Sequence, residues 1–154
     1  MVLRSAIQLS CTPEKAWDFV SDPAMIVRWN DRIRTIVPIS SGPWAANSRF
    51  RMRYEIASAA GNYLCEILEH DRPVRMVIHL TGGDLPSRGY LQEVFEIGEA
   101  QGRTVVKHEV ALYGAGRNPF SSVLLFLSHL LPRSRGKKCL RRLKELVEGG
   151  GSEG

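Results

Sequence analysis

The segment RFRMRYEI, residues 49–56, alternates apolar and charged side chains at every position. Successive side chains of a β-strand point to opposite faces of the sheet, so the apolar residues of this segment share one face and the charged residues share the other. Such alternation is typical of an antiparallel sheet with one buried and one hydrated face. We therefore expect a strand here, with Arg51 and Arg53 pointing to solvent.

The same period of two continues on both sides of this segment, over residues 32–113. Turn-forming residues interrupt it at 41–43, 61–62, 71–73, 82–83 and 98–102. These breaks divide the region into about six strands. Residues 2–10 predict one more strand before it, which gives a sheet of about seven strands with a single apolar face.

Two short helices are predicted between the first strand and the rest of the sheet. Thr12 offers a capping hydroxyl and Pro13 suits the first helical position, and apolar residues follow at helical spacing as far as Val20. The pair Asp22-Pro23 repeats this signal and predicts a second helix that ends at Trp29.

A long helical stretch follows the strands, from about Pro119 to Val147. Its first half is apolar nearly all round, and its second half has leucines on one face and charged pairs on the other. Pro132 removes a backbone hydrogen bond, so we expect a kink or break between about Ser128 and Arg135. Because the sheet has one apolar face, this helix should cover it, which defines an α+β fold.

Length and composition indicate one globular domain, residues 1–148, followed by a disordered tail at 149–154. The chain has 154 residues, of which 44% are hydrophobic and 24% charged, so collagen-like and disordered classes are excluded. The longest apolar run, residues 120–131, would reach about 18 Å, short of a bilayer core of about 30 Å. The N-terminus lacks the features of a secretory signal, and we expect a cytoplasmic protein.

The net charge of +5 is concentrated near the C-terminus. Residues 133–148, called the basic segment below, hold seven basic and two acidic residues and so account for the whole excess. Its residues 133–144 could make a weak contact with an anionic membrane surface, or the segment could be an ordinary hydrated helix face. It contains no aromatic residue for base stacking, so nucleic acid is not expected as a partner.

Several motifs, in their order along the chain, resemble the polyketide cyclase/dehydrase and START-like superfamily (SRPBCC, Bet v 1-like). They are TPEKAW at 12–17, DP at 22–23, Trp29, GRT at 102–104 and LRRLK at 140–144. The resemblance covers residues 2–148. It implies a helix-grip fold, in which a curved antiparallel sheet wraps the long C-terminal helix and leaves an apolar cavity. Members of the superfamily include lipid carriers, hydrophobic-ligand receptors, cyclases and aromatases, so the fold does not decide the function.

Side chains facing such a cavity would suit an apolar or aromatic ligand, although the same residues could simply pack against the helix. The resemblance places Trp29 near the cavity mouth. The candidate ligand-binding residues are Trp29, Phe50, Met52, Tyr54, Met76, Ile78, Phe95, His108, Val110, Leu112, Leu124 and Leu127.

Two polar residues interrupt apolar strand faces. Glu93 alternates with Leu91 and Phe95, and His108 alternates with Val106 and Val110. A four-residue loop at 99–102 would place Glu93 directly opposite His108 across a hairpin. In an enzyme this pair could transfer protons while Tyr54 orients a carbonyl group. In a carrier it would orient the ligand, and it could also be only a satisfied polar pair.

The sequence calls for no cofactor and no metal. It contains no GxGxxG, GxxxxGK[ST], HExxH, GxSxG or paired CxxC motif, and its three cysteines are far apart. We therefore expect a protein that binds a small hydrophobic molecule, such as a lipid, a polyketide-like compound or an isoprenoid. An enzyme of the cyclase, aromatase or dehydratase type is the alternative, and membrane or partner docking through the basic segment is the third hypothesis. The oligomeric state stays open.

Overall fold

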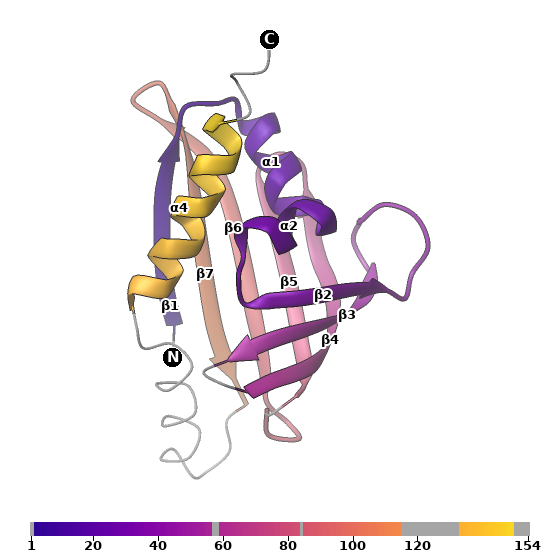
Figure 1. Cartoon of the computed structure of the whole chain (residues 1–154). Coiled ribbons are helices and arrows are strands. Elements are labelled where there is room, and N and C mark those ends of the chain that lie inside the picture. Colours follow the sequence, from indigo (N-terminus) through magenta and orange to yellow (C-terminus); the bar gives the residue numbers. More distant parts are fainter. Residues whose placement is uncertain (1, 57–58, 84, 115–132, 150–154) are drawn as a thin grey trace.

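A computed structural model describes residues 2–56, 59–83, 85–114 and 133–149 (Figure 1). Two short helices follow the first strand, six further strands follow them, and a helix ends the described chain. The elements are β1 (Val2–Leu9), α1 (Pro13–Ser21), α2 (Pro23–Trp29), β2 (Ile33–Pro38), β3 (Arg49–Ile56), β4 (Ala59–Asp71), β5 (Arg75–Gly82), β6 (Tyr90–Ala100), β7 (Arg103–Tyr113) and α4 (Arg133–Gly149).

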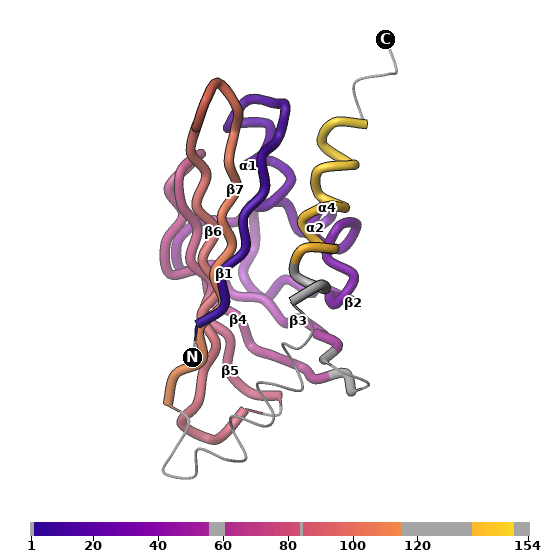
Figure 2. The backbone as a smooth tube through the Cα atoms, turned by 90° about the vertical axis from the view of Figure 1, so that its left-hand side faces the viewer, coloured from indigo at the N-terminus to yellow at the C-terminus, as the bar shows by residue number. Residues whose placement is uncertain are grey.

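The strands form one antiparallel sheet in the order β1-β7-β6-β5-β4-β3-β2. Seen from the side, α2 and α4 lie on the same side of the sheet (Figure 2). The face of the sheet toward the helices is called the inner face below, and the opposite one the outer face. The predicted α+β class, the number of strands and the two early helices are confirmed.

Both short helices begin as the sequence predicts. The Thr12 side chain accepts a hydrogen bond from the Lys15 backbone N–H at 3.2 Å, ahead of the proline that opens α1. The Asp22 carboxylate accepts one from the Ala24 N–H at 2.8 Å at the start of α2. Each cap satisfies a backbone N–H that the helix itself cannot bond.

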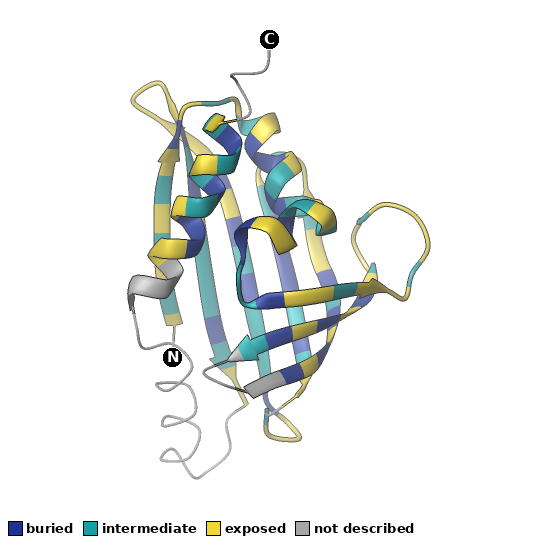
Figure 3. Ribbon diagram, viewed as in Figure 1, coloured by how far each residue is buried: buried dark blue, intermediate teal, exposed yellow. Residues whose placement is uncertain are grey.

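The core lies between the inner face and the helices (Figure 3). Phe50 and Met52 of β3 are buried there, whereas Arg51 and Arg53 between and beside them are exposed, as the alternation predicts. The helices contribute apolar residues to the same cluster: Ala16, Trp17, Val20, Ile26, Trp29, Cys139, Leu140, Leu143 and Val147. Burial of this single apolar layer is what holds the helices on the sheet.

The predicted break at Gly61-Asn62 is wrong, because both residues lie inside β4. A Cβ atom on Gly61 would lie 2.8 Å from the ring of Tyr63, and one on Gly83 would lie 2.5 Å from the same ring. Tyr63 is buried, so its ring has little room to move aside. The glycine at position 61 therefore admits a close-packed tyrosine and does not mark a turn.

The predicted four-residue loop at 99–102 is also wrong. Ala100 pairs with Arg103, so only Gln101 and Gly102 connect β6 to β7. Both have positive φ, 54° and 72°, as a two-residue type I′ turn requires. Glutamine is an uncommon residue for the first of these positions. Because of this shorter turn, Glu93 faces Val110 directly, and His108 faces Phe95.

The C-terminal helix is described from Arg133 onward as α4. The expected first half of that helix, the kink at Pro132, and the candidate residues Leu124 and Leu127 lie outside the described residues. So does the expected tail, apart from Gly149, which ends α4. Within the described ranges, no helix is long and apolar enough to cross a membrane.

Candidate functional site

The inner face brings together the sequence-predicted site residues that the structure describes. β3 supplies Phe50, Met52 and Tyr54, and β5 supplies Met76 and Ile78. The neighbouring β6 and β7 add Glu93, Phe95, His108, Val110 and Leu112, and α2 adds Trp29. One surface, built from five elements, therefore holds the candidates.

Trp29 is fixed in the core. Its indole N–H donates to the Phe19 carbonyl at 2.9 Å, and its ring meets Phe95 edge-on at a centroid distance of 6.2 Å. Only 1% of its surface is exposed. Trp29 thus ties α1 and α2 to the sheet.

Glu93 and His108 are in contact, but in a different strand register from the predicted one. The His108 Nε2 atom lies 3.4 Å from Glu93 Oε2, and the two side chains are 14% and 5% exposed. They are diagonal neighbours across the hairpin, because Phe95 stands directly opposite His108. The contact lacks hydrogen-bond geometry, and His108 Nε2 has no hydrogen-bond partner among the described residues. Buried polar atoms without a hydrogen-bond partner are uncommon in folded proteins.

Tyr54 has a partner that the sequence reasoning missed. Its hydroxyl group lies near the guanidinium of Arg32, and its ring packs edge-on against Tyr63 at a centroid distance of 6.2 Å. Burial raises the pKa of Tyr54, and the negative charge of Glu93 raises it further, so the phenol stays neutral. We name Arg32, Tyr54, Glu93 and His108 the polar cluster.

The turn between α2 and β2 positions Arg32. The Asn30 side chain accepts from the Arg32 backbone N–H at 3.2 Å, and the Arg32 carbonyl accepts from the Glu55 N–H at 2.6 Å. This places Arg32 beside β3, one residue before Ile33 pairs with Tyr54. No sequence signal distinguishes Arg32 from an ordinary charged turn residue.

Asp31, in the same turn, is directed to α4. Its carboxylate lies 3.7 Å from Lys138 and 3.4 Å from Arg142, and the Cys139 thiol lies 3.4 Å from its other oxygen. Lys144 donates to the Gln8 carbonyl of β1 and to Glu148, each at 2.9 Å. Part of the charge of the basic segment therefore holds α4 in place. Docking of this segment on an anionic membrane stays a prediction.

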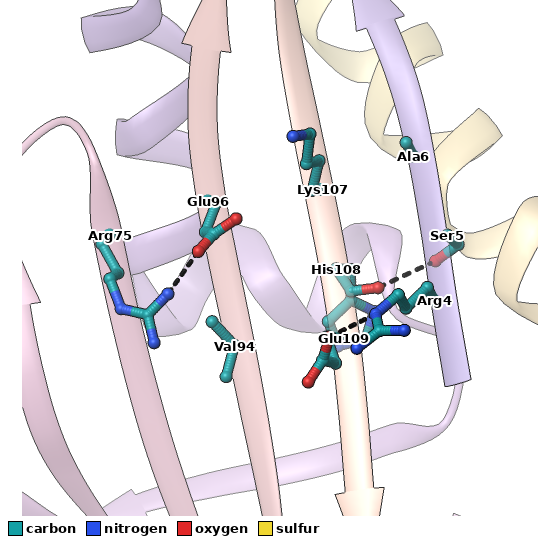
Figure 4. Close-up of a pocket in the computed structure, with 9 residues that line it drawn as sticks. All are labelled: Arg4, Ser5, Ala6, Arg75, Val94, Glu96, Lys107, His108 and Glu109. Carbon is teal, nitrogen blue, oxygen red and sulfur yellow. Dashed lines mark hydrogen bonds and ion pairs between the residues drawn. The ribbon is translucent and has the colours of Figure 1, made fainter. Parts of the chain in front are cut away.

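The outer face has a shallow groove of about 490 Å³ (Figure 4). Arg4 pairs with Glu109 at 2.6 Å, and Arg75 pairs with Glu96, while Val94 lies between the two pairs. These charges satisfy one another and lie on the hydrated side of the sheet. Among the described residues, no cluster of three or more His, Cys, Asp or Glu side chains could hold a metal ion.

Comparison with known proteins identifies the family. The model of the family "Polyketide cyclase / dehydrase and lipid transport" matches residues 2–148, so the chain belongs to this family. No match was found among curated proteins.

Solved structures show the same fold at low identity. The protein TTHA0849 from Thermus thermophilus is 16% identical, with a TM-score of 0.76 over 99% of this chain and 100% of that one. Ara h 8.0201 is 12% identical, with a TM-score of 0.70 over 97% and 98% of the two chains. A START superfamily protein from Mycobacterium smegmatis is 15% identical, with a TM-score of 0.69 over 96% and 97%. The helix-grip expectation is thus confirmed, and family membership implies ligand binding in an internal cavity in general terms.

Proposed function

We propose that the protein binds a small hydrophobic molecule between the inner face of the sheet and the C-terminal helix. One observation carries this proposal: the buried His108 Nε2 atom has no hydrogen-bond partner among the described residues, beside a buried carboxylate on an apolar face. If position 108 served packing alone, an apolar side chain there would stabilise the fold more than a histidine whose buried nitrogen atom has no hydrogen-bond partner. A ligand with a polar group would give this atom a partner.

The residues around the polar cluster favour an apolar ligand. Met52 of β3 and Met76 and Ile78 of β5 are buried on the inner face, and methionine side chains adapt to ligands of different shape. His108, Val110 and Leu112 on the inner face of β7 are only partly buried, unlike Phe50 or Met76. This partial exposure supports a binding region along β7.

The proposal is tested by displacing a neutral fluorescent probe, N-phenyl-naphthylamine, with apolar compounds. The wild-type protein should bind the probe, and Met52→Trp should weaken binding because the larger ring fills the inner face. Leu64→Trp is the control, since Leu64 is an exposed residue of β4 on the outer face. Undiminished binding to a folded Met52→Trp variant would count against this site.

A second candidate function is favoured by the contact between Glu93 and His108. A carboxylate and an imidazole within reach of one another, near the neutral Tyr54 hydroxyl, have the groups needed for proton transfer to and from a bound carbonyl compound. The corresponding enzyme would be a cyclase, aromatase or dehydratase. It would use the same site and the same apolar lining.

A further inference from the structure

The outer face of β3 carries three arginines, Arg49, Arg51 and Arg53, which are called the arginine row below. All three are exposed, and none forms an ion pair with any acidic residue that the structure describes, whereas the neighbouring Arg34 is paired with Glu55. Alternate residues of a strand lie about 6.8 Å apart on the same face, so these positive charges repel one another. An anionic partner would offset this repulsion.

Aliphatic side chains accompany the arginine row on both neighbouring strands. Val37 of β2 and Leu64 of β4 stand directly opposite Arg51, one on each side of it. Ile39 follows β2, and its backbone N–H donates to the Arg49 carbonyl at 2.9 Å. Val37, Ile39 and Leu64 are 54%, 48% and 37% exposed. Large aliphatic residues that stay exposed together mark a contact surface, and here they lie among cations.

An anionic phospholipid surface matches both kinds of side chain. Its headgroups attract exposed arginines, and aliphatic side chains enter the boundary between headgroups and acyl chains. A nucleic acid would call for aromatic side chains that stack on its bases, and the described outward-facing residues of β2, β3 and β4 include none. An acidic polypeptide would give the arginines a partner but would leave the aliphatic side chains without one.

The arginine row and the basic segment lie at opposite ends of the sheet. β3 is next to β2, which forms one edge of the sheet, whereas α4 lies beside β1 at the other edge (Figure 1). The arginine row is on the outer face, and α4 lies on the inner side of the sheet (Figure 2). The two basic surfaces can therefore be altered independently of one another.

We propose that the outer face of β2, β3 and β4 docks on an anionic lipid surface, with the arginine row on the headgroups and Val37 and Leu64 at the acyl boundary. This proposal goes beyond the proposed function, because it concerns the opposite face of the sheet and does not depend on what the inner face binds. Contact through the outer face leaves the inner face free. Because the arginines are exposed, their attraction to the lipid surface is screened by salt.

Sedimentation with lipid vesicles tests the proposal. The wild-type protein should bind vesicles of equal parts phosphatidylcholine and phosphatidylserine far more tightly than pure phosphatidylcholine vesicles, and binding should weaken from about 0.05 M to about 0.5 M salt. Replacing all three residues of the arginine row by glutamine should weaken binding at least about tenfold. The control replaces three exposed cations of the helices, as Arg28→Gln, Lys137→Gln and Arg141→Gln together, and should stay within about threefold of the wild type.

A second pair of variants separates a lipid surface from an acidic polypeptide. Val37→Ser combined with Leu64→Ser should weaken vesicle binding, because it removes the aliphatic side chains and leaves the arginine row intact. The same double variant should bind poly-L-glutamate as the wild type does. Tighter wild-type binding to poly-L-glutamate than to the vesicles, at equal concentrations of negative charge, would assign the surface to an acidic polypeptide and overturn the proposal.

The remaining outcomes also decide. Failure of the wild-type protein to bind anionic vesicles overturns the proposal, and so does an equal or greater loss of binding in the helix control than in the arginine-row variant. Binding of N-phenyl-naphthylamine reports on the inner face alone, and it should be unchanged in the arginine-row variant. Failure of the wild type to bind this probe contradicts the proposed function and not the docking surface. If the triple variant does not fold, Arg51→Glu provides the test, since it reverses the central charge of the row.

Discussion

His108 lies flat against Phe95, its direct partner across the β6–β7 hairpin, with parallel rings 4.4 Å apart. This stacking fixes the plane of the imidazole and leaves its Nε2 atom 3.4 Å from Glu93 Oε2. Phe95 in turn meets Trp29 edge-on. Aromatic packing therefore holds the His108 ring in place beside Glu93, which preorganises this part of the inner face.

Replacing His108 by phenylalanine distinguishes a carrier from an enzyme. The new ring can keep the stacking on Phe95, so the melting temperature should change little and a neutral apolar probe should bind within about threefold of the wild-type affinity. An enzyme that uses His108 should lose turnover. Loss of apolar-probe binding by a folded variant would contradict the expectation that a wholly apolar ligand does not depend on the His108 imidazole.

Gly61→Ala should destabilise the fold, whereas Gly98→Ala should not. A methyl group at Gly61 would meet the buried ring of Tyr63, and overpacking of this kind costs about 1–3 kcal/mol. Gly98 is also a strand glycine, but nothing lies within 4 Å of an added Cβ atom there. Denaturant unfolding measures both variants, and equal free energies of unfolding would contradict the packing described for Tyr63.

His70 should make the free energy of unfolding depend on pH. Its ring packs edge-on against Trp17 at 5.1 Å, and burial, with Arg72 nearby, lowers its pKa below the ordinary value of 6.5. As the pH falls below that value, the unfolded chain takes up a proton before the native one does, so stability should decrease. Above it, His70 contributes no pH dependence.

Unfolding midpoints between about pH 5 and pH 8 test this sign, since the His70 contribution should make the wild-type stability rise up to about pH 6.5 and then level off. His70→Gln should flatten that part of the profile. A variant with the wild-type slope would show that His70 is not its source.

The three cysteines should be alkylated slowly in the native protein. Burial, together with Asp31, raises the pKa of Cys139 to about 11, and burial also raises the pKa values of Cys65 and Cys11. Because the thiolate is the reactive form, iodoacetamide near pH 8 should modify half-buried Cys11 first. Mass spectrometry after digestion gives the order, and rapid native labelling of Cys139 would contradict its position against Asp31.

The sequence predicts those features that depend on local patterns. Alternation over 49–56 was enough to place Met52 inside and Arg51 outside, and the Thr12 and Asp22 caps located both short helices. These signals work because strand side chains alternate strictly and because helix starts need a specific hydrogen-bond acceptor.

Features that depend on distant residues were missed. In the sequence, Gly61 looks like a turn residue. Only the folded structure shows that the ring of Tyr63 packs against both Gly61 and Gly83, which leaves no room for a side chain at either position. The hairpin register changed because Gln101 adopts a left-handed conformation that its residue type seldom takes. The contact of Arg32 with Tyr54 joins a turn to a strand more than twenty residues away, and no local pattern encodes it.

Methyl NMR during titration with N-phenyl-naphthylamine tests the central claim, ligand binding at the inner face, most directly. The methyl groups of Met52, Met76 and Ile78 face the interior, whereas those of Val77, Val94 and Leu64 belong to the outer face of the same sheet. We predict saturable shifts of the inner-face methyl resonances, with the outer-face resonances unchanged. Shifts confined to the outer-face methyl groups, or no saturable shifts at all, would contradict the account.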